Sequence, residues 1–314
     1  MVGIITKLSF FIVNKIFVKQ RIDNFLIKKF KKIPKSKLYK IIRKGYIRIN
    51  KKRVQAKYKL KIGDLIRIPP LKINYNKKKK KINIKMQNIL LKNILYEDNI
   101  LLIINKPSGI SVHGGSGINF NIIDSLRMIR PYDKYLELIH RLDRYTSGIL
   151  MLAKKKSSLR YFHENFRKNL IQKKYLALVH RKCLFHKKIV NAPLLKKNIL
   201  NKKKMVTVDK LGKPSKTIFK KKKSNLLYTL LSIIPYTGRT HQIRVHLEFL
   251  KHPIIFDSRY GNQNLDKNIT TKKLNKVLLL HARKIVFLHP ILKKKISIHA
   301  PLDKNFKNAI KHLF

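Results

Sequence analysis

Apolar and polar positions follow two different patterns along this chain, and the change divides it into two structured regions. In the first region, residues 19–71, apolar side chains recur at helical spacing over 21–30 and predict a helix. A second helix is expected to begin at Ser36, whose hydroxyl can cap it, and to end at Gly45. Short strands are predicted at 47–49 and 65–68, which makes the region a small α/β domain.

The second region, residues 91–314, alternates short apolar strands with amphipathic helices. Helices are predicted over 157–167 and 240–249. Strands are predicted over 94–96, 100–104, 149–153, 175–179 and 228–234. Strand clusters with interspersed helices are typical of an α+β domain built around a sheet.

Two lysine runs interrupt these patterns. Residues 72–90 lose the periodicity and contain Lys77–Lys81. Because like charges repel and extend a chain, this stretch is predicted to be a flexible linker between the two domains. A second run, Lys220–Lys223, lies inside the second domain and is predicted to be a loop.

The composition is that of a globular protein with a strong positive charge. Of the 314 residues, 44% are hydrophobic, which is ordinary for a protein with a packed core. Lys and Arg total 75 against 14 Asp and Glu, for a formal net charge of +61. Such a charge favours a polyanionic partner, and on charge alone RNA, DNA and an anionic membrane all stay open.

Cysteine usage and hydropathy exclude several classes of protein. Cys183 is the single cysteine, so the chain can form neither an internal disulfide nor a cysteine-rich metal site. The apolar runs 8–13 and 100–104 are far shorter than the roughly 18 residues that a membrane-spanning helix needs. We therefore expect no metal and no membrane partner, and a soluble protein of the cytoplasm.

The first domain has an uncompensated basic surface. Between Asn24 and Gly63 there are sixteen Lys or Arg in forty positions and no acidic residue. Such a surface suits a phosphate backbone, although a solvated face without a partner is the alternative. The order of elements resembles the small RNA-binding module named after protein four of the small ribosomal subunit. The candidate RNA-binding residues here are Lys37, Lys40, Arg43, Lys44, Lys51, Lys52 and Arg53.

The strongest candidate for chemistry is the segment from His140 to Leu150. In a chain poor in carboxylates, Asp143 stands between Arg141 and Arg144, ahead of a Thr-Ser-Gly turn and an apolar strand. Neighbouring guanidinium groups favour the ionised form of a carboxyl group. Folds often hold reactive groups in turns beside buried strands. Taken alone, the segment would also fit a structural ion pair.

Residues 140–148, His-Arg-Leu-Asp-Arg-Tyr-Thr-Ser-Gly, resemble the signature of the ribosomal large subunit pseudouridine synthases. Tyr145 departs from it, since that family usually has Asp at this variable position. Further segments resemble the same family in order: Asn105–Gly109, Gln172–Tyr175, Thr237–His246, and Leu280–Ala282 with His289–Pro290. One branch of the family matches more closely, at 20–26, 112–117 and 252–257, the last with Phe256 where relatives more often have Gly.

The resemblance implies a pseudouridine synthase fold, a bent mixed β-sheet with flanking helices, and an RNA isomerase that needs no cofactor. Asp143 would be catalytic, either by attacking the sugar or by assisting elimination. Arg244 would pair with it. Tyr175 would stack on the uracil and help to move the proton on carbon 5. Arg141 would fill the stack that a flipped uridine leaves.

These inferences predict a monomeric two-domain enzyme that isomerises uridines in 23S rRNA or in a large-subunit assembly intermediate. Arg239 and His241 are expected to organise their turn or to touch RNA. Two alternatives stay open: a sister enzyme acting on other rRNA or tRNA uridines, and a non-catalytic RNA-binding or ribosome-assembly protein. A pure binder has no need of a carboxylate set beside Tyr and Arg, which favours an enzyme.

Overall fold

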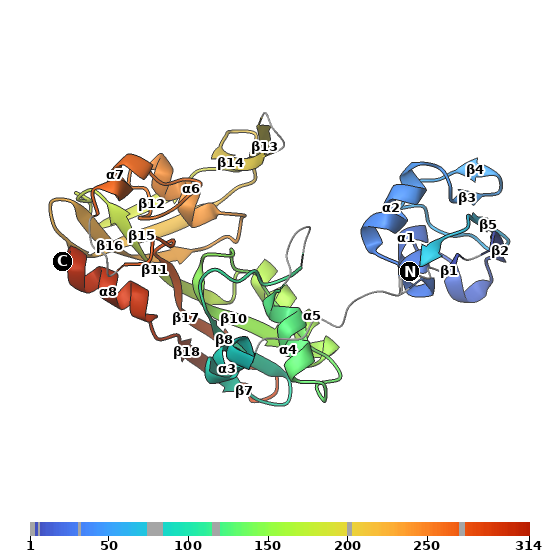
Figure 1. The fold of residues 1–314 in the computed structure, drawn as a ribbon, viewed down its shortest axis with the longest axis horizontal. Helices are drawn as coiled ribbons and strands as arrows, with labels where there is room; N and C mark the ends of the chain where they lie inside the picture. The colour runs from blue at the N-terminus through green and yellow to red at the C-terminus, as the bar shows by residue number, and fades with distance from the viewer. Residues whose placement is uncertain are drawn as a thin grey trace. The chain divides into compact units, whose positions relative to one another are not determined.

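The computed structural model describes residues 4–5, 7–30, 33–73, 84–114, 120–199, 203–269 and 274–314. The chain folds into two compact units, Met1–Lys81 and Ile82–Phe314 (Figure 1). Within the described residues, no helix is long and apolar enough to cross a membrane.

The first unit packs two helices against a small antiparallel sheet. Helices α1 (Ile22–Lys29) and α2 (Lys35–Arg43) share one buried apolar cluster with the strands. The sheet has the order β2 (Ser9–Ile12), β5 (Leu65–Ile68), β3 (Arg48–Ile49), β4 (Lys52–Arg53). The short 3-10 helix η1 (Lys15–Phe17) follows β2, and β1 (Ile4–Ile5) pairs with β6 (Lys72–Ile73).

The ends of α2 test the two signals that predicted this helix. Gly45 follows it with φ +73°, the left-handed conformation that favours glycine at a helix end. The predicted cap at Ser36 is wrong, because the helix begins at Lys35 after Pro34 and no side chain caps it. Ser36 therefore lies inside the first turn.

The predicted linker 72–90 differs from the structure at both ends. At its start, Lys72–Ile73 forms β6 in the first unit. At its end, helix α3 (Ile84–Lys92) belongs to the second unit and buries Leu90 completely in the apolar core. The lysine run 77–81 lies outside the described residues. The helix that follows the run packs Met86 and Leu90 against the core.

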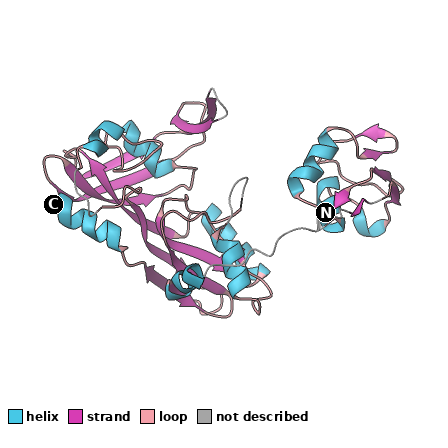
Figure 2. Ribbon diagram, viewed as in Figure 1, coloured by secondary structure: helices cyan, strands magenta, loops and turns pink. Residues whose placement is uncertain are grey.

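The second unit is built on a ten-stranded mixed sheet (Figure 2). Every strand pair described in it is antiparallel except β10 with β17, which is parallel. The expected α+β class and mixed sheet are thereby confirmed. The order is β12 (Lys187–Asn191), β15 (Lys216–Ser224), β16 (Tyr228–Pro235), β11 (Gln172–His180), β17 (Leu280–Leu288), β10 (Ser147–Ala153), β8 (Leu101–Lys106), β7 (Ile94–Glu97), with β18 (Lys295–His299) beside β17 and β9 (Glu137–Leu138) beside β10.

Helices cover the sheet and a separate hairpin adjoins it. The helices are α4 (Ile122–Ile129), α5 (Lys156–Arg167), α6 (Gln242–Phe249), α7 (Gln263–Lys267) and α8 (Lys304–Leu313). The hairpin pairs β13 (Leu194–Ile199) with β14 (Lys203–Val208), and α6 lies against β14 and β16. The predicted helices over 157–167 and 240–249 are present as α5 and α6, with small differences at their ends.

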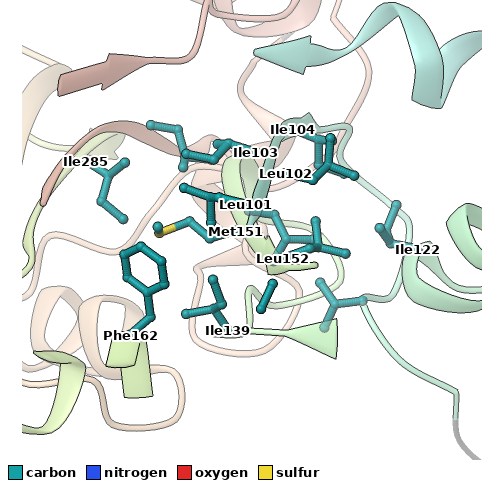
Figure 3. Packing of buried hydrophobic residues seen from close by; sticks show 14 of the residues in the cluster. Leu101, Leu102, Ile103, Ile104, Ile122, Ile139, Met151, Leu152, Phe162 and Ile285 are labelled. Carbon is teal, nitrogen blue, oxygen red and sulfur yellow. The ribbon is translucent and has the colours of Figure 1, made fainter. Parts of the chain in front are cut away.

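Two buried apolar clusters each stabilise one half of this sheet. One joins β8 and β10 to α4, α5 and β17, as Figure 3 shows for Met151, Leu152 and Phe162. The other joins β11, β15 and β16 to α6. Tyr175 packs against both clusters, so it marks the place where the two halves meet.

The lysine run 220–223 is a strand and not the predicted loop. It forms the second half of β15, which pairs with β12 on one side and β16 on the other. The same strand buries Thr217, Ile218 and Phe219 in its first half. The long aliphatic stems of lysine can lie along a strand while the charged ends reach outward, so the charge run alone did not indicate a loop.

Candidate active site

Asp143 lies in the turn that leads into β10, where its carboxylate is half-buried. The backbone N–H of Thr146 donates to the Asp143 carbonyl at 3.2 Å and closes this turn. The Asp143 side chain keeps 28% of its surface exposed, and that of its partner Arg244 keeps 9%. Asp143 is thus held by the backbone and remains open to a substrate from one side.

Gly148 lets β10 come close to β17, whose other side pairs with β11, the strand that carries Tyr175. The φ of Gly148 is +103°, and a Cβ there would lie 2.3 Å from the carbonyl oxygen of Ala282 in β17. Ala282 is the register partner of Gly148 in β10 and of Tyr175 in β11. The register of β11 against β17 shifts between Lys174 and Tyr175, where Arg283 of β17 is left without a partner in β11. The Thr-Ser-Gly turn therefore serves long-range strand packing.

Arg244 in α6 connects two carboxylates. Its Nη1 donates to Asp143 Oδ2 at 2.8 Å. Its Nε and Nη2 donate to the two oxygens of Asp257, each at 2.7 Å. Burial lowers the pKa of Arg244, but the hydrogen bonds and charges of Asp257 and Asp143 outweigh it and leave that pKa raised. A permanent cation is therefore fixed beside Asp143.

Asp257 holds Arg244 in place, and the Asp257 side chain is only 1% exposed. Burial raises the pKa of Asp257, while the hydrogen bonds and charge of Arg244 reverse this and leave it lowered. Asp257 Oδ1 also accepts the backbone N–H groups of Arg259 at 2.9 Å and Tyr260 at 3.1 Å. Asp257 was noticed in the sequence only as part of a family segment, and its role as the second partner of Arg244 was missed.

Phe256 adopts the backbone conformation that favours glycine, with φ +59°. Asp266 Oδ1 accepts the Phe256 N–H at 3.0 Å and lies 2.7 Å from His180 Nε2, so it secures this strained residue. The Phe256 ring is buried in an apolar cluster with α8. The position suits the Gly found more often in relatives, and burial of the ring offsets the strain here.

Tyr175 keeps its proton beside Asp143. Burial raises the pKa of Tyr175 well above its usual range, and the negative charge of Asp143 adds to the shift. The phenol is therefore a hydrogen-bond donor at neutral pH, with its ring at the junction of the two halves of the sheet. A ring and a donor beside one carboxylate suit a planar, polar base.

Lys106 binds its own loop, residues 106–110, to the turn that contains Asp143. Its side chain is fully buried, and Nζ donates to the carbonyls of Pro107 at 2.9 Å, Ile110 at 3.0 Å and Arg144 at 3.0 Å. Burial lowers the pKa of Lys106 to about 7, and the charge of Asp143 opposes this shift. Three carbonyl acceptors match the three N–H groups of an ammonium ion. Lys106 therefore joins the Asn-Lys-Pro-Ser-Gly segment to the backbone directly after Asp143.

The arginines that flank Asp143 in the sequence do not supply its ion pair. Arg144 Nε donates to the Gly109 carbonyl at 2.8 Å, and its guanidinium lies 5.3 Å from the ring centre of Tyr145. Arg141 is exposed, and burial together with the Arg141 charge lowers the pKa of His113. The charge partner of Asp143 is Arg244, 101 residues away in the sequence.

His241 also lies at Asp143, which the sequence did not predict. Its Nε2 is 3.8 Å from Asp143 Oδ1, and its Nδ1 is 2.8 Å from the hydroxyl of Tyr260. His241 directly precedes α6 with φ +54°, and no side chain caps that helix, so the expectation that His241 organises its turn stays a prediction. Arg239 lies outside this group and donates through Nε to the Pro214 carbonyl at 3.1 Å.

Four of the seven residues of the first unit that are predicted to bind RNA line two open hollows, of 640 and 610 Å³. Arg53 lines both, Lys52 lines the larger, and Lys40 and Arg43 line the smaller. Six of the seven predicted residues are exposed, and Lys37 is partly buried. In the described parts of the chain, no group of three or more His, Cys, Asp or Glu is placed to hold a metal ion.

Comparison with known proteins assigns the class. A family model described as RNA pseudouridylate synthase matches residues 100–249, which include Asp143, Tyr175 and Arg244, and an S4 domain model matches residues 20–66. A human protein, RNA Pseudouridylate Synthase Domain Containing 4, has a solved structure with a TM-score of 0.59 and 26% sequence identity, over 73% of this chain and 95% of that one. The chain belongs to the RNA pseudouridylate synthase family.

Proteins named ribosomal large subunit pseudouridine synthase C are similar to it over nearly the whole length. The one from Buchnera aphidicola subsp. Schizaphis graminum (strain Sg) is 55% identical over 309 residues, 98% of each chain. The one from Escherichia coli (strain K12) is 46% identical over 298 residues, 94% of this chain and 93% of the other. These matches confirm that the chain resembles one branch of the family, the proteins named synthase C, more closely. The expected pseudouridine synthase fold is confirmed as well.

Proposed function

We propose that this isomerase converts uridines of 23S rRNA to pseudouridine, with Asp143 as the catalytic carboxylate. One observation carries the proposal: Arg244 binds one oxygen of Asp143 at 2.8 Å, and the Asp143 side chain is still 28% exposed. The full-length similarity to enzymes named for the large ribosomal subunit supports the choice of RNA. This substrate fits a cytoplasmic location.

Three residues would divide the chemistry around the uridine. The reaction breaks the bond between carbon 1′ of the ribose and N1 of the uracil, turns the base and rejoins it through carbon 5. Asp143 acts on the electron-poor sugar, by attack or by assisting elimination. Tyr175 stacks on the uracil, and its hydroxyl donates to the base or moves the carbon-5 proton. Arg244 keeps Asp143 ionised and oriented.

The target uridine must leave its stack to reach this site, which costs a few kcal/mol. Arg141 is exposed next to the catalytic turn, and its planar guanidinium can occupy the vacated position. The basic residues around the hollows of the first unit contact phosphates and hold the RNA, whether mature 23S rRNA or an assembly intermediate.

Asp143→Asn tests the catalytic role. The amide keeps the shape of the side chain and loses its charge, so conversion of uridine should fall at least a thousandfold while RNA binding changes by less than about threefold. Rates are measured by single-turnover conversion of uridine in a short rRNA fragment, with far-ultraviolet circular dichroism as a check on folding. Activity within tenfold of the unmodified enzyme would remove Asp143 from catalysis. Full-strength binding by an unmodified protein that converts no uridine would favour a non-catalytic RNA-binding protein.

A further inference from the structure

One histidine beside Asp143 has no part in the chemistry described so far. Arg244 occupies Asp143 Oδ2, so Oδ1 is the oxygen left to face the sugar. His241 Nε2 lies 3.8 Å from that same Oδ1. A substrate that contacts Oδ1 can therefore place another of its atoms within hydrogen-bond reach of His241 Nε2.

The groups on the two sides of the His241 ring favour one position for its proton. The Tyr260 hydroxyl accepts the backbone N–H of Val206 at 3.1 Å and lies 2.8 Å from His241 Nδ1. Nε2 lies 3.8 Å from Asp143 Oδ1, and a carboxylate oxygen can only accept, so we assign the ring proton to Nε2 and the acceptor role to Nδ1, which takes the hydroxyl proton of Tyr260. A neutral imidazole whose Nδ1 accepts must carry its proton on Nε2. The N–H bond of His241 thus lies on the side of Asp143.

The surroundings of His241 keep the imidazole neutral. Burial lowers its pKa, the charges of Arg244 and Arg259 lower it further, and those of Asp143 and Asp257 raise it, with a net lowering. The ring of Tyr260 packs on His241 at 5.4 Å between ring centres and on the Arg244 guanidinium at 5.0 Å. The imidazole is therefore a neutral donor, held by Tyr260 through ring packing and a hydrogen bond.

The backbone of His241 is strained. Its φ of +54° and ψ of +17° are left-handed, a conformation that is unfavourable for a residue with a Cβ. Such strain persists where surrounding structure imposes it, and it gathers at functional sites. Here it brings the ring from the start of α6 to Asp143 and Tyr260.

We propose that His241 is a second catalytic residue, whose Nε2–H donates a hydrogen bond to the uracil as it leaves carbon 1′. When the bond from carbon 1′ to N1 breaks, its electron pair moves onto the uracil, and the negative charge spreads to the ring carbonyl oxygens. A rigid donor at that position stabilises the charge without giving up its proton. The inference rests on the proposed role of Asp143, which brings the sugar to this place.

The test compares His241→Leu, which removes the donor, with His241→Gln, which keeps an N–H near the position of Nε2. Single-turnover rates are measured on a short RNA, with enzyme in excess, beside the dissociation constant for the same RNA. His241→Leu should be about a hundredfold slower with binding changed by less than about threefold, and His241→Gln should recover about tenfold of the loss. His312→Leu, at an exposed histidine near the end of α8, is the matched control and should keep the full rate.

A better leaving group separates a donor to the base from a residue that only positions Asp143. Fluorine on carbon 5 stabilises the uracil anion, so 5-fluorouridine in the same RNA needs less help to depart. Loss of the original nucleoside is followed for both RNAs. The deficit of His241→Leu should shrink at least fivefold on the fluorinated RNA. A full rate for His241→Leu, or the same deficit on both RNAs, would overturn the proposal.

Two further variants make every outcome decisive. Asp143→Asn is run in the same assays, because an active Asp143→Asn would refute the proposed catalytic residue whatever His241 does. An inactive Asp143→Asn beside a fully active His241→Leu would refute the role of His241 alone. Should His241→Leu fail to fold, Tyr260→Phe decides. It keeps the ring, frees His241 Nδ1 and should slow single turnover about tenfold, and an unchanged rate would overturn the proposal.

Discussion

Replacing Arg244 by Met should destabilise the protein mainly through Asp257. The substitution keeps much of the apolar bulk and removes the cation that binds both oxygens of a carboxylate only 1% exposed. Breaking a buried ion pair costs about 3 to 5 kcal/mol. Asp257 retains two backbone N–H donors, so we expect the lower end, about 3 kcal/mol, or a little over a hundredfold in the unfolding equilibrium.

The dependence on pH gives this prediction its sign. In the unmodified protein the pKa of Asp257 is lowered, so its contribution to stability is present above the unfolded carboxyl pKa of about 3.9 and is lost as pH falls through the folded value. Without Arg244, burial instead raises the pKa of Asp257, and protonation relieves the unpaired charge as pH falls. The difference in unfolding free energy should therefore be largest near neutral pH and narrow toward about pH 4.

Urea unfolding followed by circular dichroism between those pH values is the assay. The double variant Arg244→Met with Asp257→Asn should recover most of the lost stability, because the buried charge is gone. Asp143→Asn is the matched control and should cost less than about 1 kcal/mol, since Asp143 is 28% exposed and Arg244 keeps Asp257. A difference that stays constant with pH, or a double variant as unstable as the single one, would refute the reasoning.

Two further predictions concern the base and the RNA. Tyr175→Phe keeps the stacking ring and removes the hydroxyl, so RNA affinity should stay within about twofold while single turnover slows about a hundredfold; an unchanged rate would leave only stacking for Tyr175. Deleting residues 1–81, which ends before α3, should weaken RNA binding and flatten its dependence on salt, because phosphate contacts are lost. A salt slope equal to that of the full chain would assign the phosphate contacts to the second unit.

Local patterns in the sequence were sufficient for those elements whose formation depends on near neighbours. Apolar periodicity predicted α5 and α6, and apolar runs predicted β8, β10, β11 and β16. Gly45 predicted the end of α2, because glycine readily adopts the left-handed conformation that it has there. The lysine runs predicted a loop at 220–223, which was wrong, and a linker at 72–90, which was wrong in part. The structure has β15 and α3 there, because these elements are stabilised by packing partners elsewhere in the chain.

The candidate site shows the same division. The scarcity of carboxylates and the motif around it indicated Asp143, and the family resemblance indicated Tyr175 and Arg244, yet the sequence suggested the wrong neighbours for the Asp143 charge. Arg141 and Arg144 are adjacent in the chain, but the turn directs their side chains elsewhere.

Tertiary structure alone decided what surrounds Asp143. The parallel pairing of β10 with β17, and the register shift between β11 and β17, bring Tyr175 to the turn that holds Asp143. The start of α6 and the segment after it bring His241 and Asp257 to Arg244. Asp143 and its partner Arg244 are 101 positions apart, and their contact depends on strand register and on the close approach at Gly148. No local pattern contains that information, because a contact between distant residues forms only after the sheet has assembled.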